Sequence, residues 1–573
     1  MRKLLVHIRK YRKECIMGPL FKLLEALLEL FVPLVIAAII DNGIGGGDKG
    51  YVIKMCLMLI LLGIIGLAFS ITAQFFAAKA SVGFVTNLRH ELFKHIESLS
   101  YSELDEVGTA TLITRMTSDI NQIQTGVNLT LRLLLRSPFV VFGAMIMAFT
   151  INVKAALIFA VTIPVLSAVV FGIMLWCIPL YKKVQQRLDS VLGKTRENLT
   201  GVRVIRAFCK EKEETAEFEN RNSELTSAQK FVGKISALMN PVTYVIINLA
   251  VIWLIHTGGV QVNSGEISQG DVVALYNYMS QILVELIKLA NLIISLTKCV
   301  ACGNRVQSVF EIRSSQKTDS DPVQKADGDI AVEFRNVSLR YKNAGDDALT
   351  GMSFTVKKGE TVGIIGGTGS GKTSLVNMIP RFYDASQGEV IIGGINVRDY
   401  PLEQLREKIG IVPQKAVLFK GTVRENMQWG KNNATDEEIM KAARTAQAAE
   451  VIESKGGLDF QLEQGGKNLS GGQRQRFTIA RALVREPEIL ILDDSASALD
   501  FATDAALRRS IREMESSPTV FIVSQRTSSI AHADKIIVLD DGKIVGLGRH
   551  EELLESCPVY NEIYSSQFKK EAV

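Results

Sequence analysis

The chain has 573 residues, of which 47% are hydrophobic and 22% are charged, and its mean hydropathy is +0.18. Because domains run to about 100–200 residues, the length excludes a single-domain protein. The mean hydropathy is high although charged residues are frequent, so apolar and charged residues are concentrated in different regions of the chain. We expect the apolar region to lie in a membrane. The net charge of +5 is small for this length and gives no reason to expect nucleic acid as a partner.

The first thirteen residues form a basic, amphipathic segment. Its cationic side chains are Arg2, Lys3, Arg9, Lys10, Arg12 and Lys13, and apolar residues lie between them. A segment of this kind binds the surface of an anionic lipid leaflet. The sequence therefore predicts contact with membrane lipids at this end and an N-terminus in the cytoplasm.

Six apolar stretches are long enough to cross a membrane, for which a helix needs about 20 residues. They lie near residues 16–40, 52–78, 131–152, 155–178, 241–262 and 272–297. Lys and Arg are scarce in the short connections 41–50, 152–154 and 257–270 but frequent in the long connections 79–130 and 179–240. Because positive charge marks cytoplasmic loops, the long connections and both termini are predicted to be cytoplasmic.

The two long connections also carry apolar residues at helical spacing. The membrane helices are therefore predicted to continue into the cytoplasm and to reverse near residues 102–109 and 201–208. Such reversals are where a membrane domain would touch a soluble domain.

Charged residues inside two predicted spans have two interpretations. Glu25 and Glu29 lie four apart in the first span, and Glu285 and Lys288 lie in the sixth. Ionisable groups at membrane depth are costly. These residues therefore either form a polar wall facing a substrate cavity, lined by Glu25 and Glu29, or belong to structural pairs such as Lys22 with Glu25 or Glu285 with Lys288. The sequence leaves both open.

The second half of the chain has a different pattern. Residues 1–311 are assigned to the membrane domain and the polar residues 312–328 to a linker. Beyond it, residues 329–573 alternate short strand-like runs with helical ones, which predicts an α/β nucleotide-binding domain.

A phosphate-binding loop dominates this half. Its residues are Gly366, Gly367, Thr368, Gly369, Ser370, Gly371, Lys372 and Thr373, between a strand-like run and a helix that takes in Ser374. Glycines let backbone N–H groups close around phosphate oxygens, Lys372 reaches the β- and γ-phosphates, and the Thr373 hydroxyl is suited to Mg²⁺. Asp493, at the end of a later apolar run, supplies a carboxylate for the same ion.

Further motifs resemble those of the ATP-binding-cassette family. They are Leu469, Ser470, Gly471, Gly472 and Gln473, together with Tyr341, Gln414, Asp493 and the turn that ends at Asp500. The resemblance implies an exporter half-transporter over essentially the whole chain, using ATP and Mg²⁺. It implies that Tyr341 stacks on adenine, that Gln414 contacts Mg²⁺, that Ser470–Gly472 bind the γ-phosphate of ATP on a partner chain, and that Asp500 lies at the seam between the two chains.

Two positions depart from the family pattern. Asp494 stands where the family usually has the Glu that polarises the attacking water, and Gln525 stands where it usually has His. An Asp carboxylate is one methylene shorter, and placing a general base is worth about 10²–10⁴-fold. The departures predict a site that binds ATP and hydrolyses it poorly.

Taken together, these features predict an ATP-driven exporter of amphipathic compounds such as drugs, lipids or peptides. Its partner is expected to be a second half-transporter with an intact catalytic Glu, in the plasma membrane of a bacterium. The alternatives are a homodimeric lipid or peptide exporter and an ATP-gated channel or regulatory subunit.

Overall fold

The computed structural model describes residues 2–316, 328–342 and 344–568 and divides into two compact units. The first, here the helical unit, contains Met1–Glu97 and Ala110–Ile312. The second, here the α/β unit, contains Ser98–Thr109 and Arg313–Val573. The segment Ser98–Thr109 was predicted within the membrane domain, but it packs with the α/β unit. Most of the predicted linker 312–328 lies outside the described residues.

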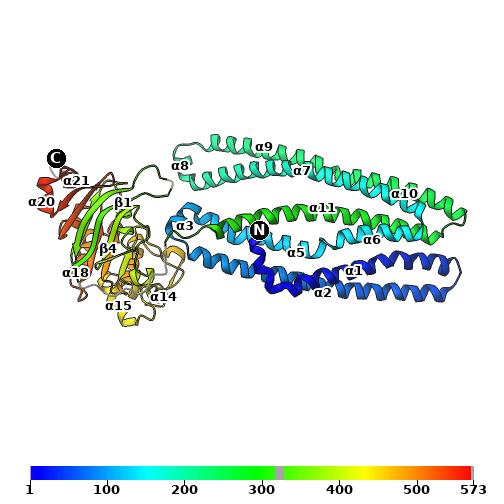
Figure 1. Cartoon of the computed structure of the whole chain (residues 1–573). Helices are drawn as coiled ribbons and strands as arrows, with labels where there is room; N and C mark the ends of the chain where they lie inside the picture. Colours follow the sequence, from blue (N-terminus) through cyan, green and yellow to red (C-terminus); the bar gives the residue numbers. More distant parts are fainter. Residues whose placement is uncertain (1, 317–327, 343, 569–573) are drawn as a thin grey trace. The chain divides into compact units, whose positions relative to one another are not determined.

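The helical unit consists of long helices (Figure 1). The elements from its part of the chain are η1 (Arg2–Tyr11), α1 (Arg12–Ala38), η2 (Ile39–Ile44), α2 (Lys49–Glu97), α4 (Thr109–Thr114), η3 (Arg115–Asp119), α5 (Ile120–Leu133), α6 (Arg136–Ile151), α7 (Val153–Thr200), α8 (Val202–Ala207), α9 (Glu211–Ala237), α10 (Met239–Asn263) and α11 (Gln269–Glu311). Helix α2 has 49 residues and α7 has 48. At about 1.5 Å per residue, each is longer than the roughly 30 Å of a hydrocarbon core, so both extend beyond a membrane.

Five helical segments of the described chain are long and apolar enough to cross a membrane. They are Lys3–Ile44, Lys49–Glu97, Thr109–Ile151, Val153–Thr200 and Glu211–Asn263. These five cover the first five predicted spans, except that the third segment ends one residue before the predicted 131–152 does. The sixth, 272–297, lies in α11, which is not among them and which carries Asn277, Gln281, Glu285 and Lys288 along its length. Six crossings therefore stay a prediction.

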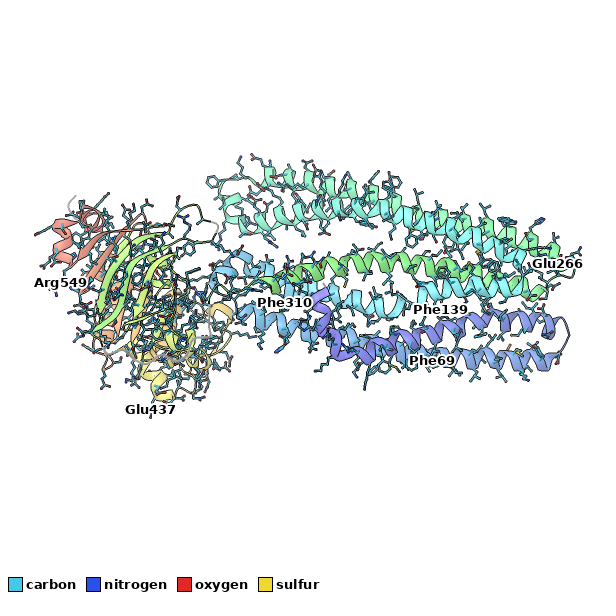
Figure 2. The ribbon with its side chains drawn as sticks, in the orientation of Figure 1. Phe69, Phe139, Glu266, Phe310, Glu437 and Arg549 are labelled. Atoms are coloured by element: carbon cyan, nitrogen blue, oxygen red, sulfur yellow. The ribbon has the colours of Figure 1, made fainter. Side chains whose placement is uncertain are left out.

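The three short connections predicted outside the membrane lie together at one end of the helical unit. Glu266, in the turn after α10, is at this end (Figure 2) and pairs with Lys154 at 3.1 Å. The Asp41 carboxylate accepts hydrogen bonds from Ser268 Oγ at 2.6 Å and from the backbone N–H of Gly270 at 2.8 Å. The contacts join the loops 41–50, 152–154 and 257–270 at one end of the helical unit. That this end faces outside the membrane stays a prediction.

Near that end, one apolar core holds five helices together. It includes Leu30 of α1, Ala144 of α6, Phe159 of α7, Leu254 of α10 and Tyr278 of α11. Farther along the chain, α7 and α9 run side by side (Figure 1) and are joined by the short helix α8. The chain reverses there, as predicted for residues 201–208.

The α/β unit contains the remaining elements. They are α3 (Tyr101–Val107), β1 (Ile330–Leu339), β2 (Leu349–Lys357), β3 (Thr361–Gly366), α12 (Lys372–Asn377), β4 (Gln387–Ile392), β5 (Ile395–Asn396), α13 (Leu402–Glu407), β6 (Ile409–Val412), β7 (Gly421–Thr422), α14 (Val423–Gln428), α15 (Asp436–Thr445), α16 (Ala449–Ser454), β8 (Gln461–Leu462), η4 (Gln464–Gly466), α17 (Gly471–Leu483), β9 (Ile489–Asp493), α18 (Phe501–Arg512), β10 (Thr519–Val523), α19 (Thr527–Ile530), β11 (Lys535–Asp540), β12 (Lys543–Gly548), α20 (His550–Ser556) and α21 (Pro558–Phe568).

Two larger sheets organise this unit. The six-stranded sheet has the order β12-β11-β3-β10-β9-β6, with parallel pairing from β11 to β6 and antiparallel β12 at the edge. The four-stranded antiparallel sheet has the order β2-β1-β4-β5. The β10–β9 register pairs Val523 with Asp493, and the β10–β3 register pairs Val523 with Ile364. The loops after β3, β9 and β10 therefore leave the same edge of the sheet, where ligands of such sheets bind.

Candidate nucleotide-binding site

The loop between β3 and α12 can fold only with glycine at two of its positions. Gly371 has φ +92°, and a Cβ there would lie 2.7 Å from the Ala348 carbonyl oxygen. A Cβ on Gly366 would lie 2.1 Å from the Leu539 carbonyl oxygen. The backbone is thus packed too closely for side chains, as a loop that closes around phosphate requires.

The Lys372 ammonium lies over this loop. Its Nζ donates to the carbonyl oxygens of Gly366 at 3.0 Å and Gly367 at 2.7 Å. Burial lowers the pKa of Lys372, although the carboxylates of Asp494 and Asp493 oppose the shift. Lys372 is thus held at the loop, and its contact with the β- and γ-phosphates stays a prediction.

Oxygen ligands suited to Mg²⁺ meet at the ends of β9 and the loop. Thr373 Oγ1 donates to Asp493 Oδ1 at 3.1 Å. Asp493 is buried, and burial raises its pKa despite this hydrogen bond. A hydroxyl and a carboxylate are the hard oxygen donors that Mg²⁺ takes beside nucleotide phosphates, so these residues fit the ion. Gln414 lies next to them and lines the same cleft.

Asp494 is held in an unusual backbone conformation. Its φ is +46°, and its N–H donates to the Val523 carbonyl oxygen at 3.0 Å. Its carboxylate accepts a hydrogen bond from Gln414 Nε2 at 3.1 Å. Non-glycine residues rarely adopt such φ values, which cluster at functional sites. The carboxylate is thus directed along the sheet edge toward Gln414.

Tyr341 marks the predicted adenine end. Its hydroxyl lies 2.8 Å from Ser374 Oγ, and its ring packs edge-on to Tyr383 with centroids 5.0 Å apart. Burial raises the pKa of Tyr341, so the phenol stays neutral. The ring is therefore fixed from two sides.

A cleft of about 330 Å³ brings these residues together. It is lined by Tyr341, Ala348, Thr368, Gly369, Gly371, Lys372, Thr373, Ser374, Gln414, Asp493, Asp494, Val523 and Gln525. Eleven of these thirteen residues were predicted. Ala348 and Val523 were not, because small apolar residues carry no chemical signal; Val523, however, ends an apolar run directly before Ser524.

The predicted signature residues 469–473 lie elsewhere in this unit. Ser470 caps the start of α17, and its hydroxyl accepts from the Gln473 N–H at 3.3 Å. Ser470 and Gly471 are exposed, whereas Leu469 belongs to an apolar core with Phe477 of α17. Among the described residues, none of 469–473 lines the cleft. A Ser-Gly-Gly turn that opens a helix outside its own cleft is suited to an anion held by another chain.

The seam residue Asp500 also begins a helix. Its carboxylate accepts from the Thr503 N–H at 2.8 Å and from Thr503 Oγ1 at 2.8 Å, at the start of α18. These hydrogen bonds lower the pKa of Asp500, so its charge is retained at neutral pH. In the structure Asp500 caps the N-terminus of α18. Its position at the interface between two chains stays a prediction.

Helix α3 contacts the aromatic end of the cleft. Tyr383 donates to Asp105 Oδ2 at 2.5 Å, and Lys342 pairs with Glu106 at 2.6 Å. Tyr383 also touches Tyr341. The sequence predicted a reversal of the chain at 102–109. It did not single out Tyr383, because this residue belongs to no recognisable motif.

The candidate cavity residues are paired with cations. Lys22 Nζ lies 2.6 Å from a Glu25 carboxylate oxygen, and both side chains are buried. Arg136 Nη2 lies 2.6 Å from Glu29, whose side chain is 43% exposed, and Arg136 Nη1 lies 2.5 Å from buried Glu285. The pairing of Lys22 with Glu25, kept open above, is confirmed, and Arg136 was missed. A cavity role for Glu25 and Glu29 stays a prediction.

Comparisons with known proteins agree with this geometry. The description "ABC transporter transmembrane region" matches residues 15–286, and "ABC transporter" matches residues 349–497. The chain is 37% identical to the uncharacterised ABC transporter ATP-binding protein YfiB of Bacillus subtilis (strain 168), over 100% of this chain and 99% of YfiB. It is 31% identical, over 99% of both chains, to YgaD of the same strain, provisionally named a multidrug export ATP-binding/permease protein.

A solved structure has the same fold. A bacterial Atm1-family ABC exporter with ATP bound matches with a TM-score of 0.82 at 23% identity, over 97% of this chain and 99% of that one. The family matches cover both units, and the relatives cover the full length. The chain therefore belongs to the ATP-binding-cassette (ABC) transporter family, as a multi-pass membrane protein whose α/β unit is an ATPase.

Proposed function

We propose that this chain is one subunit of a heterodimeric exporter of amphipathic compounds. The exporter fold supports this, as does the similarity to YgaD, whose name refers to multidrug export. The grouping of the Lys- and Arg-poor loops at one end of the helical unit supports cytoplasmic termini. A bacterial plasma membrane suits the bacterial relatives.

ATP would lie in the cleft with adenine on Tyr341 and its phosphates under the loop and Lys372. Thr373, Asp493 and Gln414 would hold Mg²⁺, which neutralises phosphate charge when bound. Binding of ATP favours the closed arrangement of two ATPase units, and hydrolysis releases it. Transport of the substrate would therefore be driven by the change between the arrangement that ATP binding favours and the one that follows hydrolysis.

The geometry around Asp494 carries the proposal that this site hydrolyses slowly. Its short carboxylate is tied to Gln414 at 3.1 Å, and its backbone is tied to Val523. Asp494 is therefore anchored along the sheet edge, one methylene short of the reach of a glutamate. Gln525, at the same cleft, can donate a hydrogen bond to phosphate but has no imidazole to titrate. Both features favour binding over hydrolysis.

The signature residues serve the partner's site in this proposal. Ser470 and Gly471 are exposed and lie outside the cleft of their own chain. Because the partner is expected to hold an intact Glu, most turnover would occur where the signature of this chain meets the partner's ATP. This predicts that the two motifs of one chain affect turnover unequally.

The test is steady-state ATPase of this chain purified with its partner. Asp494→Asn should change turnover little, Ser470→Arg should nearly abolish it by filling the γ-phosphate position, and Lys372→Ala should fall between. Equal loss from Asp494→Asn and Ser470→Arg would show that this site is competent. Full activity of the chain purified alone would identify a homodimer.

A further inference from the structure

The C-terminal helix α21 reaches the loop that carries Gln525. Gln567 Nε2 donates to the Gln525 carbonyl oxygen at 2.8 Å. Gln567 Oε1 accepts from the Thr527 N–H at 2.9 Å and from Thr527 Oγ1 at 2.9 Å. One side-chain amide thus bridges the residues on both sides of Arg526, using its donor and its acceptor.

Helix α21 is firmly fixed at its other end. Tyr560 is fully buried, and its hydroxyl lies 2.7 Å from His550 Nδ1 of α20. Leu553 and Cys557 join Tyr560 in the larger apolar core of the α/β unit. A helix anchored in this way brings the exposed Gln567, near its C-terminal end, to the residues that follow β10.

The contacts that hold Gln525 act on its backbone and on the residues beside it. It is exposed, it lines the nucleotide cleft, and it follows β10 directly after Ser524. The peptide that carries it is fixed by β10 on one side, through the Ser524 N–H to Ile364 at 3.1 Å, and by Gln567 on the other. The Arg526 N–H also donates to Ser524 Oγ at 3.0 Å. The Gln567 contact is therefore one of three hydrogen bonds that fix the peptide from which the Gln525 side chain projects into the cleft.

We propose that Gln567 is a positioning residue that holds Gln525 toward the γ-phosphate, so that the C-terminal helix sets the preference of this site for ATP over ADP. The inference rests on the proposed role of Gln525 at the nucleotide. ADP lacks the γ-phosphate, so its binding does not use Gln525. Losing the support would lower ATP affinity and spare ADP affinity.

An alternative is that Gln567 only attaches helix α21 to the rest of the unit. Two substitutions of Gln567 test this alternative against the positioning role. Gln567→Glu keeps an oxygen that accepts from Thr527 but places a carboxylate against the Gln525 carbonyl, where no donor remains. Gln567→Leu removes both interactions. If Gln567 only docks the helix, both variants should leave the preference for ATP over ADP unchanged; if it positions Gln525, both should lower that preference.

The experiment measures displacement of a fluorescent ATP analogue by ATP and by ADP, with Mg²⁺, from the full-length chain in lipid nanodiscs. A hydrogen bond to a charged group corresponds to about a tenfold change in affinity. Gln567→Leu and Gln567→Glu should each lower the ATP preference by up to about tenfold with ADP affinity unchanged. Asn561→Ala is the matched control, because this amide on α21 contacts Leu554 of α20, and it should keep the preference.

Gln525→Ala separates failure of this inference from failure of the proposed function. It should lose the ATP preference, and adding Gln567→Leu to it should cause no further loss. An unchanged preference in Gln525→Ala would refute its role at the nucleotide. A loss in Gln525→Ala with normal behaviour of Gln567→Glu, or an equal loss in Asn561→Ala, would overturn the positioning role. If Gln567→Leu does not fold, Gln567→Glu and Gln525→Ala decide the question.

Discussion

Replacing Arg136 should destabilise the helical unit more than replacing a single exposed charged residue does. Its guanidinium lies between Glu285 at 2.5 Å and Glu29 at 2.6 Å, and its side chain is 8% exposed. Glu285 also accepts from Ser137 Oγ at 2.8 Å and from Lys288 Nζ at 2.8 Å. Three helices, α1, α6 and α11, are thereby joined through one buried cation.

The size of the effect follows from what remains after the change. Removing one partner of a buried ion pair costs about 3–5 kcal/mol. Because Glu285 keeps Ser137 and Lys288, Arg136→Met should lie at the lower end, about 3 kcal/mol. Glu29 is 43% exposed and can turn to water, so Glu29→Gln should cost only about 0–1 kcal/mol.

The assay is reversible unfolding of the purified chain in mixed detergent micelles, followed by circular dichroism. Arg136→Met combined with Glu285→Met should recover much of the loss, because a buried pair replaced by apolar residues is often neutral. Two results would refute the reasoning: a cost for Arg136→Met no larger than for Glu29→Gln, or a double variant as unstable as the sum of its single changes.

The remaining predictions concern topology and pH. In a chain without native cysteines, new cysteines at Gly46 and Ser264 should react with a membrane-impermeant reagent outside intact cells, while one at Ser315 should stay protected; the reverse pattern contradicts the charge-based topology. Burial raises the pKa of Asp493, so acidification should weaken Mg²⁺-dependent ATP binding at a higher pH than an exposed aspartate would. Titrations with and without Mg²⁺ check this, and Asp493→Asn should remove the Mg²⁺-dependent part of the profile.

The sequence by itself determined the phosphate loop and the strands that carry it. Strand-like runs of the sequence such as 361–365, 489–492 and 519–523 lie within strands β3, β9 and β10. Such runs are short, apolar and bounded by turns, so the signal is local. Strand β12 was missed because its side chains alternate between exposed and half-buried and its sequence has no apolar run of comparable strength.

Local pattern also located the five long apolar helices and the short loops between them. Apolar length and Lys and Arg counts need no knowledge of neighbours, because the bilayer acts as a uniform solvent on each segment. The sixth span is the weaker case, since polar residues interrupt α11. Glu285 does have a buried partner, Arg136, but it lies 149 positions away in the chain, whereas Lys288 pairs with Glu285 from three residues away.

Only the tertiary structure decided which distant residues meet. Arg136 lies 149 positions before Glu285, Tyr383 lies 278 after Asp105, and Gln567 lies 42 after Gln525. Periodicity reports which face of an element is buried, but it does not report what that face touches. Hydrogen bonds and ion pairs depend on distances of about 3 Å, which packing of whole helices and sheets sets. The motifs therefore identified the chemistry of the site, and the fold selected the residues that hold it in position.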